Sequence, residues 1–171
     1  LFVHRVDGIE PGLYVLLRDP KQKPLLQAAL QKPFEWRKPE GCPDVLELYL
    51  LAKADARATS RAVSCQQEIA SEGAFSLGMI AEFDPALEHF GAWFYPRLYW
   101  ECGAIGQVLY LEAEAIGVRG TGIGCYFDEP VHAVFGIATT RWRSLYHFTV
   151  GGPIEDVRLQ TWPAYPARDT G

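Results

Sequence analysis

The sequence lacks the features that would place a protein in a membrane or on a nucleic acid. It has no apolar run near the ~20 residues needed to span a bilayer, and no charged leader followed by an apolar stretch and a small-residue cleavage site. Its 16 basic residues are outnumbered by 21 acidic ones and form no cluster that would hold a phosphate backbone. We therefore expect a soluble, cytoplasmic protein with neither a membrane nor a nucleic-acid partner.

The chain is also poor in patterns that bind metals or form disulfides. Its four cysteines are Cys42, Cys65, Cys102 and Cys125. They show neither CxxC spacing nor a histidine pair at ligand distance, which disfavours both a zinc site and a disulfide framework. Because free cysteine behaves mostly as a small core residue, we expect four free thiols in a reducing cytosol and no metal site.

Nucleophilic catalysis has little support in the sequence. The four histidines are His4, His89, His132 and His147. None has a cysteine or serine partner implied by spacing, which disfavours an activated thiol or hydroxyl. The sequence therefore names no catalytic residue.

The chain does contain enough apolar material for one packed domain, since 49% of its 171 residues are apolar and 13% are aromatic. It begins at Leu1, directly inside a strand-like run, which predicts a piece cut from a longer chain. We divide the domain into a hairpin (1–18), a surface excursion (19–44), a core (45–158) and an extended tail (159–171).

Hydrophobic periodicity and turn signals predict a mixture of strands and helices. The predicted strands are 3–6, 12–17, 75–83 and 145–150, and the predicted helices are 25–30, 55–71, 84–90, 97–118 and 128–135. The run 45–51 fits either a buried strand or the start of a helix. The helix over 97–118 is apolar nearly all round, so we expect it to be central. Because helices and strands do not alternate strictly, the pattern predicts an α+β layered fold.

The most informative segment is rich in glycine, from Gly117 to Gly124. Glycines at alternate positions expose backbone N–H groups and remove side chains that would block a flat ligand. A dinucleotide-binding fingerprint would need a preceding strand and a glycine or alanine at its sixth position. A long predicted helix precedes this segment and Cys125 occupies the sixth position, so that interpretation is disfavoured. A purely structural glycine loop remains the alternative.

The neighbours of this segment form a recognisable order. Glu101, Gly103, Gln107 and Leu109 lie on the predicted long helix, the turn 120–124 follows, and then come Phe127-Asp128 and the strand that leads to Gly151-Gly152-Pro153. This order resembles the nitroreductase superfamily, and within it most closely the SagB-type branch, FMN-dependent dehydrogenases that oxidise azoline rings in modified peptides. The hairpin with Gly8 and Gly12-Leu13-Tyr14 is similar to the same branch. The resemblance covers residues 1–20 and 75–165.

The resemblance implies a nitroreductase-like layered fold, with a central, mainly antiparallel sheet flanked by helices. It places the long helix at a dimer interface, in a homodimer or in a tandem-domain pseudo-dimer. It implies FMN (flavin mononucleotide) as cofactor, with the turn from Gly120 to Gly124 against the flavin ring and a backbone N–H reaching flavin N5. Such a donor favours the electron-rich reduced flavin.

The resemblance also suggests individual cofactor contacts. Gly122 and Gly124 permit the close approach, Thr121 donates a hydroxyl, and Ile123 packs near the ring. Gln107 reaches the flavin or its ribityl chain, or else forms an interhelix amide hydrogen bond. Arg158 lies where relatives place a basic phosphate contact, although an exposed, solvated arginine is the other interpretation.

One expected part of the family pattern does not precede Leu1. Relatives begin with an Arg-x-Ser-x-Arg segment that binds the FMN phosphate, followed by a Ser-Ala-Gly turn. A phosphate dianion needs several charge-assisted donors, and this chain offers few. We therefore expect any catalytic activity to belong to the parent protein.

Two functions follow as hypotheses. The first is an FMN-dependent oxidoreductase that transfers hydride by a ping-pong mechanism to or from a small-molecule or peptide substrate. The second is a cofactor-free relative that acts in dimerisation or peptide docking. An aromatic cluster fits a core or dimer interface better than a substrate wall. Its members are Trp93, Phe94, Tyr95, Tyr99 and Trp100.

Overall fold

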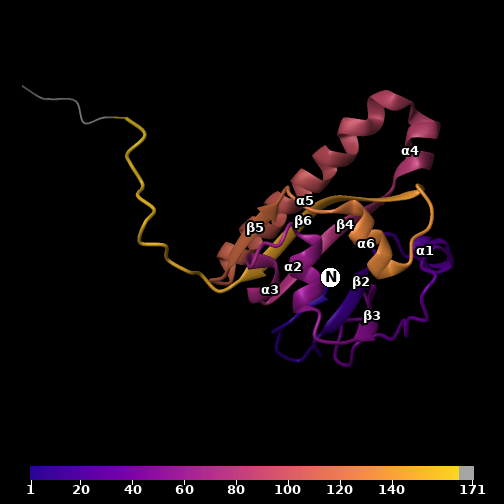
Figure 1. The fold of residues 1–171 in the computed structure, drawn as a ribbon, viewed down its shortest axis with the longest axis horizontal. Helices are drawn as coiled ribbons and strands as arrows, with labels where there is room; N and C mark the ends of the chain where they lie inside the picture. Colours follow the sequence, from indigo (N-terminus) through magenta and orange to yellow (C-terminus); the bar gives the residue numbers. More distant parts are fainter. Residues whose placement is uncertain (166–171) are drawn as a thin grey trace, which may run out of the picture.

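A computed structural model describes residues 1–165 and places a six-stranded sheet at the centre of the domain (Figure 1). The strands are β1 (Phe2–Val3), β2 (Gly12–Leu16), β3 (Leu48–Lys53), β4 (Phe75–Glu82), β5 (Arg119–Ile123) and β6 (Trp142–Gly151). Their order is β3-β2-β1-β4-β6-β5, and every neighbouring pair is antiparallel. The predicted α+β fold with a mainly antiparallel sheet is confirmed.

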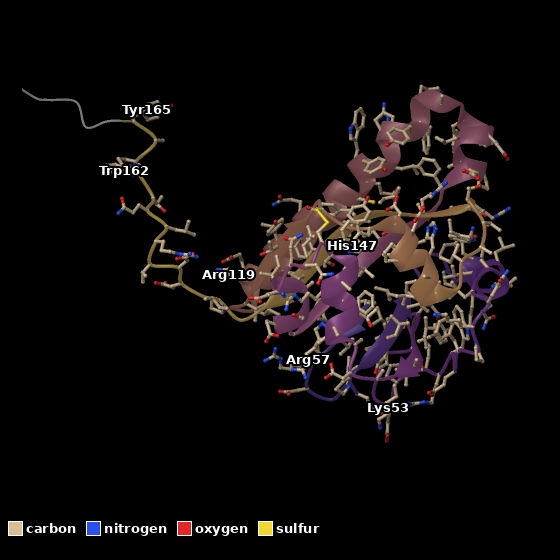
Figure 2. All side chains as sticks on the ribbon, in the orientation of Figure 1. Lys53, Arg57, Arg119, His147, Trp162 and Tyr165 are labelled. Carbon is tan, nitrogen blue, oxygen red and sulfur yellow. A yellow bond between two sulfur atoms is a disulfide. The ribbon has the colours of Figure 1, made fainter. Side chains whose placement is uncertain are left out.

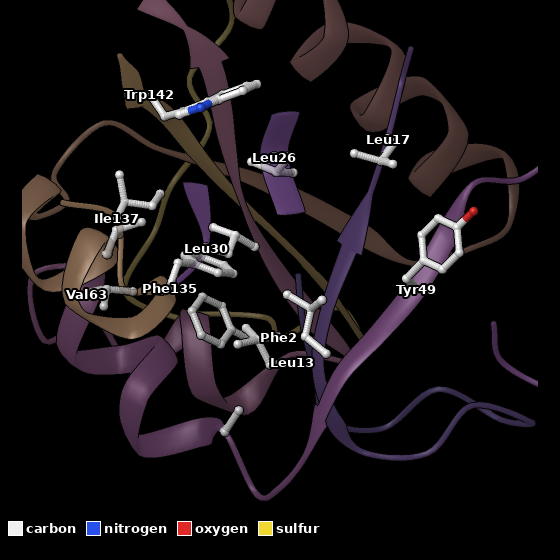
Figure 3. Packing of buried hydrophobic residues seen from close by; sticks show 13 residues of the cluster. Phe2, Leu13, Leu17, Leu26, Leu30, Tyr49, Val63, Phe135, Ile137 and Trp142 are labelled. Carbon is white, nitrogen blue, oxygen red and sulfur yellow. The ribbon is translucent and has the colours of Figure 1, made fainter. Parts of the chain in front are cut away.

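Within residues 1–165, six α-helices flank this sheet. They are α1 (Lys23–Ala29), α2 (Arg57–Val63), α3 (Ile69–Glu72), α4 (Phe83–Phe90), α5 (Tyr95–Ala115) and α6 (Asp128–Phe135). The largest core cluster joins residues of α1, α2 and α6 to the sheet, among them Leu26, Val63 and Phe135 (Figure 3). A separate cluster packs Leu98 and Cys102 of α5 against β4 and β6. Helices α1, α2 and α6 therefore cover one part of the sheet, and α5 covers β4 and β6.

Most predicted elements are confirmed within a few residues. The hairpin forms, with Phe2 opposite Leu13, and the ambiguous run 45–51 becomes strand β3. Helix α6 keeps its predicted bounds, and acidic residues occupy its first turn, where the positive end of the helix dipole favours them. Strand β6 begins at Trp142, three residues earlier than predicted.

The long helix α5 is less central than predicted. It buries Leu98, Cys102, Gly106 and Ala113, but its other sides are open. Leu111 is 61% exposed, and the neighbouring apolar side chains on the same surface are also exposed. The continuous apolar character that suggested a buried helix therefore includes a face that residues 1–165 do not cover.

Two predicted elements were wrong. The helix predicted over 55–71 is broken into α2 and α3, because Cys65 and Gln66 adopt left-handed φ angles of 53° and 61°. The turn predicted over 120–124 is mostly a strand, since residues 119–123 form β5, which pairs with β6 at the edge of the sheet. Glycine removes the alternating side-chain pattern by which a strand is usually predicted.

The expectation of four free thiols was also wrong. Cys65 and Cys125, 60 residues apart, form a disulfide, while Cys42 and Cys102 are free. The spacing of cysteines along the chain carries no information on a pair that only the tertiary fold brings together.

Beyond Gly151 the chain leaves the sheet. Residues 152–165 form neither helix nor strand and extend away from the body of the domain, with Trp162 and Tyr165 far out (Figures 1 and 2). Within the described residues, no helix is both long and apolar enough to cross a membrane.

Candidate functional site

The glycines of β5 lie beneath aromatic side chains. A Cβ atom added to Gly122 would lie 1.8 Å from the Tyr146 hydroxyl, and one added to Gly120 would lie 2.7 Å from the Phe148 ring. Both distances are far shorter than a van der Waals contact, so only glycine fits at either position. These two glycines are therefore explained by packing inside the domain.

Tyr110 of α5 completes this aromatic cluster. Its hydroxyl accepts a hydrogen bond from the Gly122 backbone N–H at 2.7 Å, and its ring lies edge-on to Phe148 at 4.9 Å. The expectation that Gly120 and Gly122 expose bare backbone to a flat ligand is wrong for the face that these rings cover. Tyr110 instead joins α5 to β5 on the face of the glycines that Tyr146 and Phe148 also cover.

Gly124 is different. A Cβ atom added there would meet no atom within 4 Å, and the residue is exposed. It directly follows β5, whose last residue, Ile123, is only 2% exposed. Of the three predicted glycine contacts, Gly124 is the one that presents open backbone at the end of a firmly packed strand.

A larger hollow lies between β2 and β4. Strand β1 pairs with β2 only at Gly12 and Leu13, and with β4 only at Phe75 and Ser76. Tyr14 of β2 also exchanges backbone hydrogen bonds with Leu1, and within residues 1–165 the facing edges of β2 beyond Tyr14 and of β4 beyond Ser76 have no partner strand. Because β1 separates them by two strand spacings, the gap is about 10 Å wide.

This gap is a mainly apolar cleft of about 450 Å³, a volume typical of small-molecule and cofactor sites. Val15 and Met79 line it from the strands, Leu109 from α5 and Phe135 from α6. Strands β4 and β6 separate it from β5, and α5 contributes to both places.

Charged groups at the cleft are few and paired. Arg18 and Glu101, both lining residues, form an ion pair at 2.5 Å. Burial raises the pKa of the Cys102 thiol to about 11, so this thiol stays protonated at neutral pH. Because the thiolate is the nucleophilic form, Cys102 is an inert wall residue.

Comparisons with known proteins identify the architecture. No protein-family model and no curated protein matches the sequence. A structure described as a candidate nitroreductase from Anabaena variabilis ATCC 29413 matches with a TM-score of 0.66 and 22% identity, over 90% of this chain and 26% of that chain. One described likewise from Ralstonia eutropha JMP134 matches with a TM-score of 0.52 and 13% identity, over 91% and 81% of the two chains. The chain has a nitroreductase-like fold.

Within this nitroreductase-like fold, the remaining predicted contacts do not converge. Thr121 is exposed on β5, and Gln107 is exposed on α5. Arg158 lies in the extended segment after β6, where it forms an ion pair with Asp156 at 2.6 Å and its side chain is 86% exposed. Thr121, Ile123 and Gly124 lie close together only because they are neighbours in the chain. Arg158 lies in a separate segment.

The described residues fit a planar ring better than a phosphate. Gly124 offers the open backbone that a flat ring requires. Arg18 at the cleft and Arg119 at the start of β5 are already paired with Glu101 and Glu114. A phosphate dianion needs several free charge-assisted donors, and these two would have to give up their partners to bind one.

A buried polar group near β5 was missed by the sequence reasoning. The His147 ring, 2% exposed, lies between the Ser64 hydroxyl, 3.2 Å from Nδ1, and the Ser144 hydroxyl, 3.0 Å from Nε2. Tyr126 stacks on the ring at 4.5 Å. Burial lowers the pKa of His147 to about 4. Both serines are nearly inaccessible, so this group stabilises the fold and does not attack a substrate; only knowledge of tertiary contacts could have found it.

Within residues 1–165, no group of three or more histidine, cysteine or acidic side chains could hold a metal ion.

Proposed function

We propose that the parent protein is an FMN-dependent oxidoreductase of the nitroreductase type, closest to the SagB-type dehydrogenases, with a small-molecule or peptide substrate. The nitroreductase-like fold supports the general class. The observation that carries the cofactor assignment is Gly124, whose backbone is open at the end of a strand that aromatic packing holds in place.

In this proposal Gly124 lies against the flavin ring, with Ile123 and Thr121 beside it. Gly120 and Gly122 act indirectly, because they admit Tyr146 and Phe148 and so fix the position of the strand end. When bound, FMN would supply hydride transfer in two half-reactions, one substrate reducing it and another being reduced. Within this chain, Gln107 and Arg158 are the proposed ribityl and phosphate contacts.

We further propose that an amino-terminal part of the domain completes the phosphate site. The unpaired facing edges of β2 and β4 support this, since one further strand would satisfy both rows of backbone groups. The same part would carry the Arg-x-Ser-x-Arg segment that supplies free cations. The proposed partner is a second copy of the domain, docked on the exposed side of α5.

The test is a titration of the full-length protein with FMN, in which binding is measured by the quenching of flavin fluorescence. We expect a Kd in the micromolar range or tighter. Gly124→Ala should weaken FMN binding about tenfold or more, ~1.4 kcal/mol, because its methyl group would occupy the space of the ring. Thermal denaturation of Gly124→Ala should match the wild type, since the added Cβ meets no neighbour in the domain.

Gly152→Ala is the matched control. Gly152 is exposed beyond β6, and an added Cβ there also meets no atom within 4 Å. We expect unchanged FMN affinity and unchanged thermal stability. Equal FMN affinity in both variants and the wild type would reject the Gly124 contact, and no binding by the full-length protein would reject the function.

A cofactor-free relative is the second candidate. It is favoured by the chain's own aromatic rings, which cover Gly120 and Gly122, and by the ion pair that Arg119, at the start of β5, forms with Glu114. Colourless full-length protein that self-associates but does not bind FMN would support it.

A further inference from the structure

The Cys65–Cys125 disulfide joins two segments that are otherwise weakly connected. Cys65 follows α2, and Cys125 directly follows Gly124. Apart from the disulfide, two hydrogen bonds connect the segments: Gln67 Nε2 donates to the Cys125 carbonyl at 3.2 Å, and Phe127 N–H donates to the Val63 carbonyl at 2.9 Å. The bond therefore contributes a large part of what fixes the end of β5 to α2.

The backbone at this junction is strained. Cys65 and Gln66 both have left-handed φ angles, which residues other than glycine rarely adopt. Such conformations persist where the surrounding structure enforces them. Hydrogen bonds from Gln66 N–H to the Arg61 carbonyl at 2.9 Å and from Arg61 Nε to the Gln66 carbonyl at 3.2 Å also hold this turn, and the disulfide is its covalent constraint, so cleavage removes one of the constraints on the turn.

The disulfide also holds in place the two residues that cover the His147 ring. Ser64 precedes Cys65 and Tyr126 follows Cys125, and these two neighbours contact the His147 ring from different sides. In Figure 2 the sulfur–sulfur bond lies near the label of His147. Movement of either cysteine therefore changes how well this ring is shielded from water.

The disulfide is open to solvent chemistry. Cys125 is exposed and Cys65 is half-buried. Disulfides that are exposed to solvent are the more readily reduced ones, so this bond is open to thiol–disulfide exchange.

We propose that Cys65 and Cys125 form a reversible thiol–disulfide site that fixes the end of β5 when oxidised and releases it when reduced by a dithiol. A thiolate of the dithiol attacks Sγ of Cys125, the more exposed of the two residues, and Cys65 leaves as a thiolate that takes up a proton. The second thiol of the reductant then displaces Cys125. Two electrons and two protons pass to the cysteines, and the dithiol becomes a disulfide.

Where the proposed flavin function also holds, this site controls the cofactor contact, because Gly124 is bonded directly to Cys125. That consequence rests on the proposed function, whereas the redox site does not. Reduction would then weaken FMN binding by loosening the backbone at Gly124.

The first measurement counts thiols. Protein equilibrated with oxidised glutathione and then denatured should incorporate two alkylating groups per chain, at Cys42 and Cys102. Treatment with dithiothreitol before alkylation should raise the count to four, with the new labels at Cys65 and Cys125 by mass spectrometry. Four labels in the oxidised sample would overturn the proposal.

The second measurement compares hydrogen exchange of the oxidised and reduced wild type without FMN. Reduction should speed exchange in residues 63–67 and 124–128 about tenfold or more, as expected for local opening, and leave β3 unchanged. The pKa of His147, followed by NMR, should rise from about 4 on reduction, since Tyr126 and Ser64 would no longer exclude water from the ring. Tyr126 and the Leu1 amino group are the titratable groups that bear on this ring, and neither is removed by reduction.

Cys42→Ser is the matched control, since Cys42 is a free thiol elsewhere in the fold and its variant should keep the full redox response. Cys65→Ser should lose it. Identical exchange in the oxidised and reduced wild type would overturn the proposal even if Cys65→Ser does not fold. Failure to bind FMN would count only against the flavin function.

Discussion

At the scale of single residues, His147 makes the stability of the folded domain depend on pH. Its folded-state pKa of about 4 lies below the value of about 6.5 for an unfolded histidine, because the buried ring cannot be solvated when charged. The unfolded chain therefore binds the proton more readily. The stabilisation is complete above about pH 6.5 and is lost as pH falls toward 4. Burial also lowers the pKa of His4, which adds to the same trend.

We expect the free energy of unfolding to fall by roughly 3 kcal/mol between pH 7 and pH 4 on account of His147, from a shift of about 2.5 pKa units. Urea denaturation at several pH values measures it. His147→Gln should flatten part of this slope, while His89→Gln, at an exposed position, should not. A slope unchanged by His147→Gln would contradict the assignment.

At the scale of elements, the sequence predicted what local patterns determine. Periodicity was sufficient for α5, the acidic residues before Pro130 were sufficient for α6, and the apolar run predicted the strand β4. Only Ser76 of β4 is buried, so the expected cover on both sides of this strand is wrong. The elements that were predicted wrongly all depend on contacts with residues that are distant in the sequence. β5 exists because β6 and Tyr110 pack against its glycines, and the break after α2 accompanies a bond to Cys125. Within the candidate site, the sequence indicated Gly124 but not the rings over Gly120 and Gly122.

The packing of α5 and β6 on β5 gives a prediction for the strand. Gly122→Ala should destabilise the domain by about 2–3 kcal/mol, because the new methyl group would overlap the Tyr146 hydroxyl. Tyr146→Phe removes that hydroxyl, so the double variant should recover part of the loss. Thermal or urea denaturation of the four proteins forms a double-mutant cycle. Additive effects would show that the two residues do not meet as described.

At the scale of the whole molecule, the domain leaves a broad apolar surface uncovered. Val108 and Leu111, one helical turn apart on α5, are 56% and 61% exposed. Trp93 and Trp100, 63% and 60% exposed, extend this surface toward α4, and the Arg97 guanidinium lies 4.5 Å from the ring centre of Trp100. Monomeric proteins rarely expose contiguous apolar patches of more than a few hundred Å². This surface is therefore where we expect a second copy to dock.

The expected dimer can be tested with charge substitutions on this surface. Sedimentation velocity over a range of concentrations should show self-association of the wild type, since stable interfaces commonly bury about 1,200–2,000 Å². Val108→Glu with Leu111→Glu should weaken association at least about tenfold, because two carboxylates would lose water at the contact. Both positions are exposed, so the monomer should keep its stability within about 0.5 kcal/mol. Val45→Glu, at a position 93% exposed outside α5, is the control and should associate like the wild type. If the wild type stays monomeric at high micromolar concentration, the expected dimer is contradicted. The apolar face of α5 would then contact another part of the parent protein.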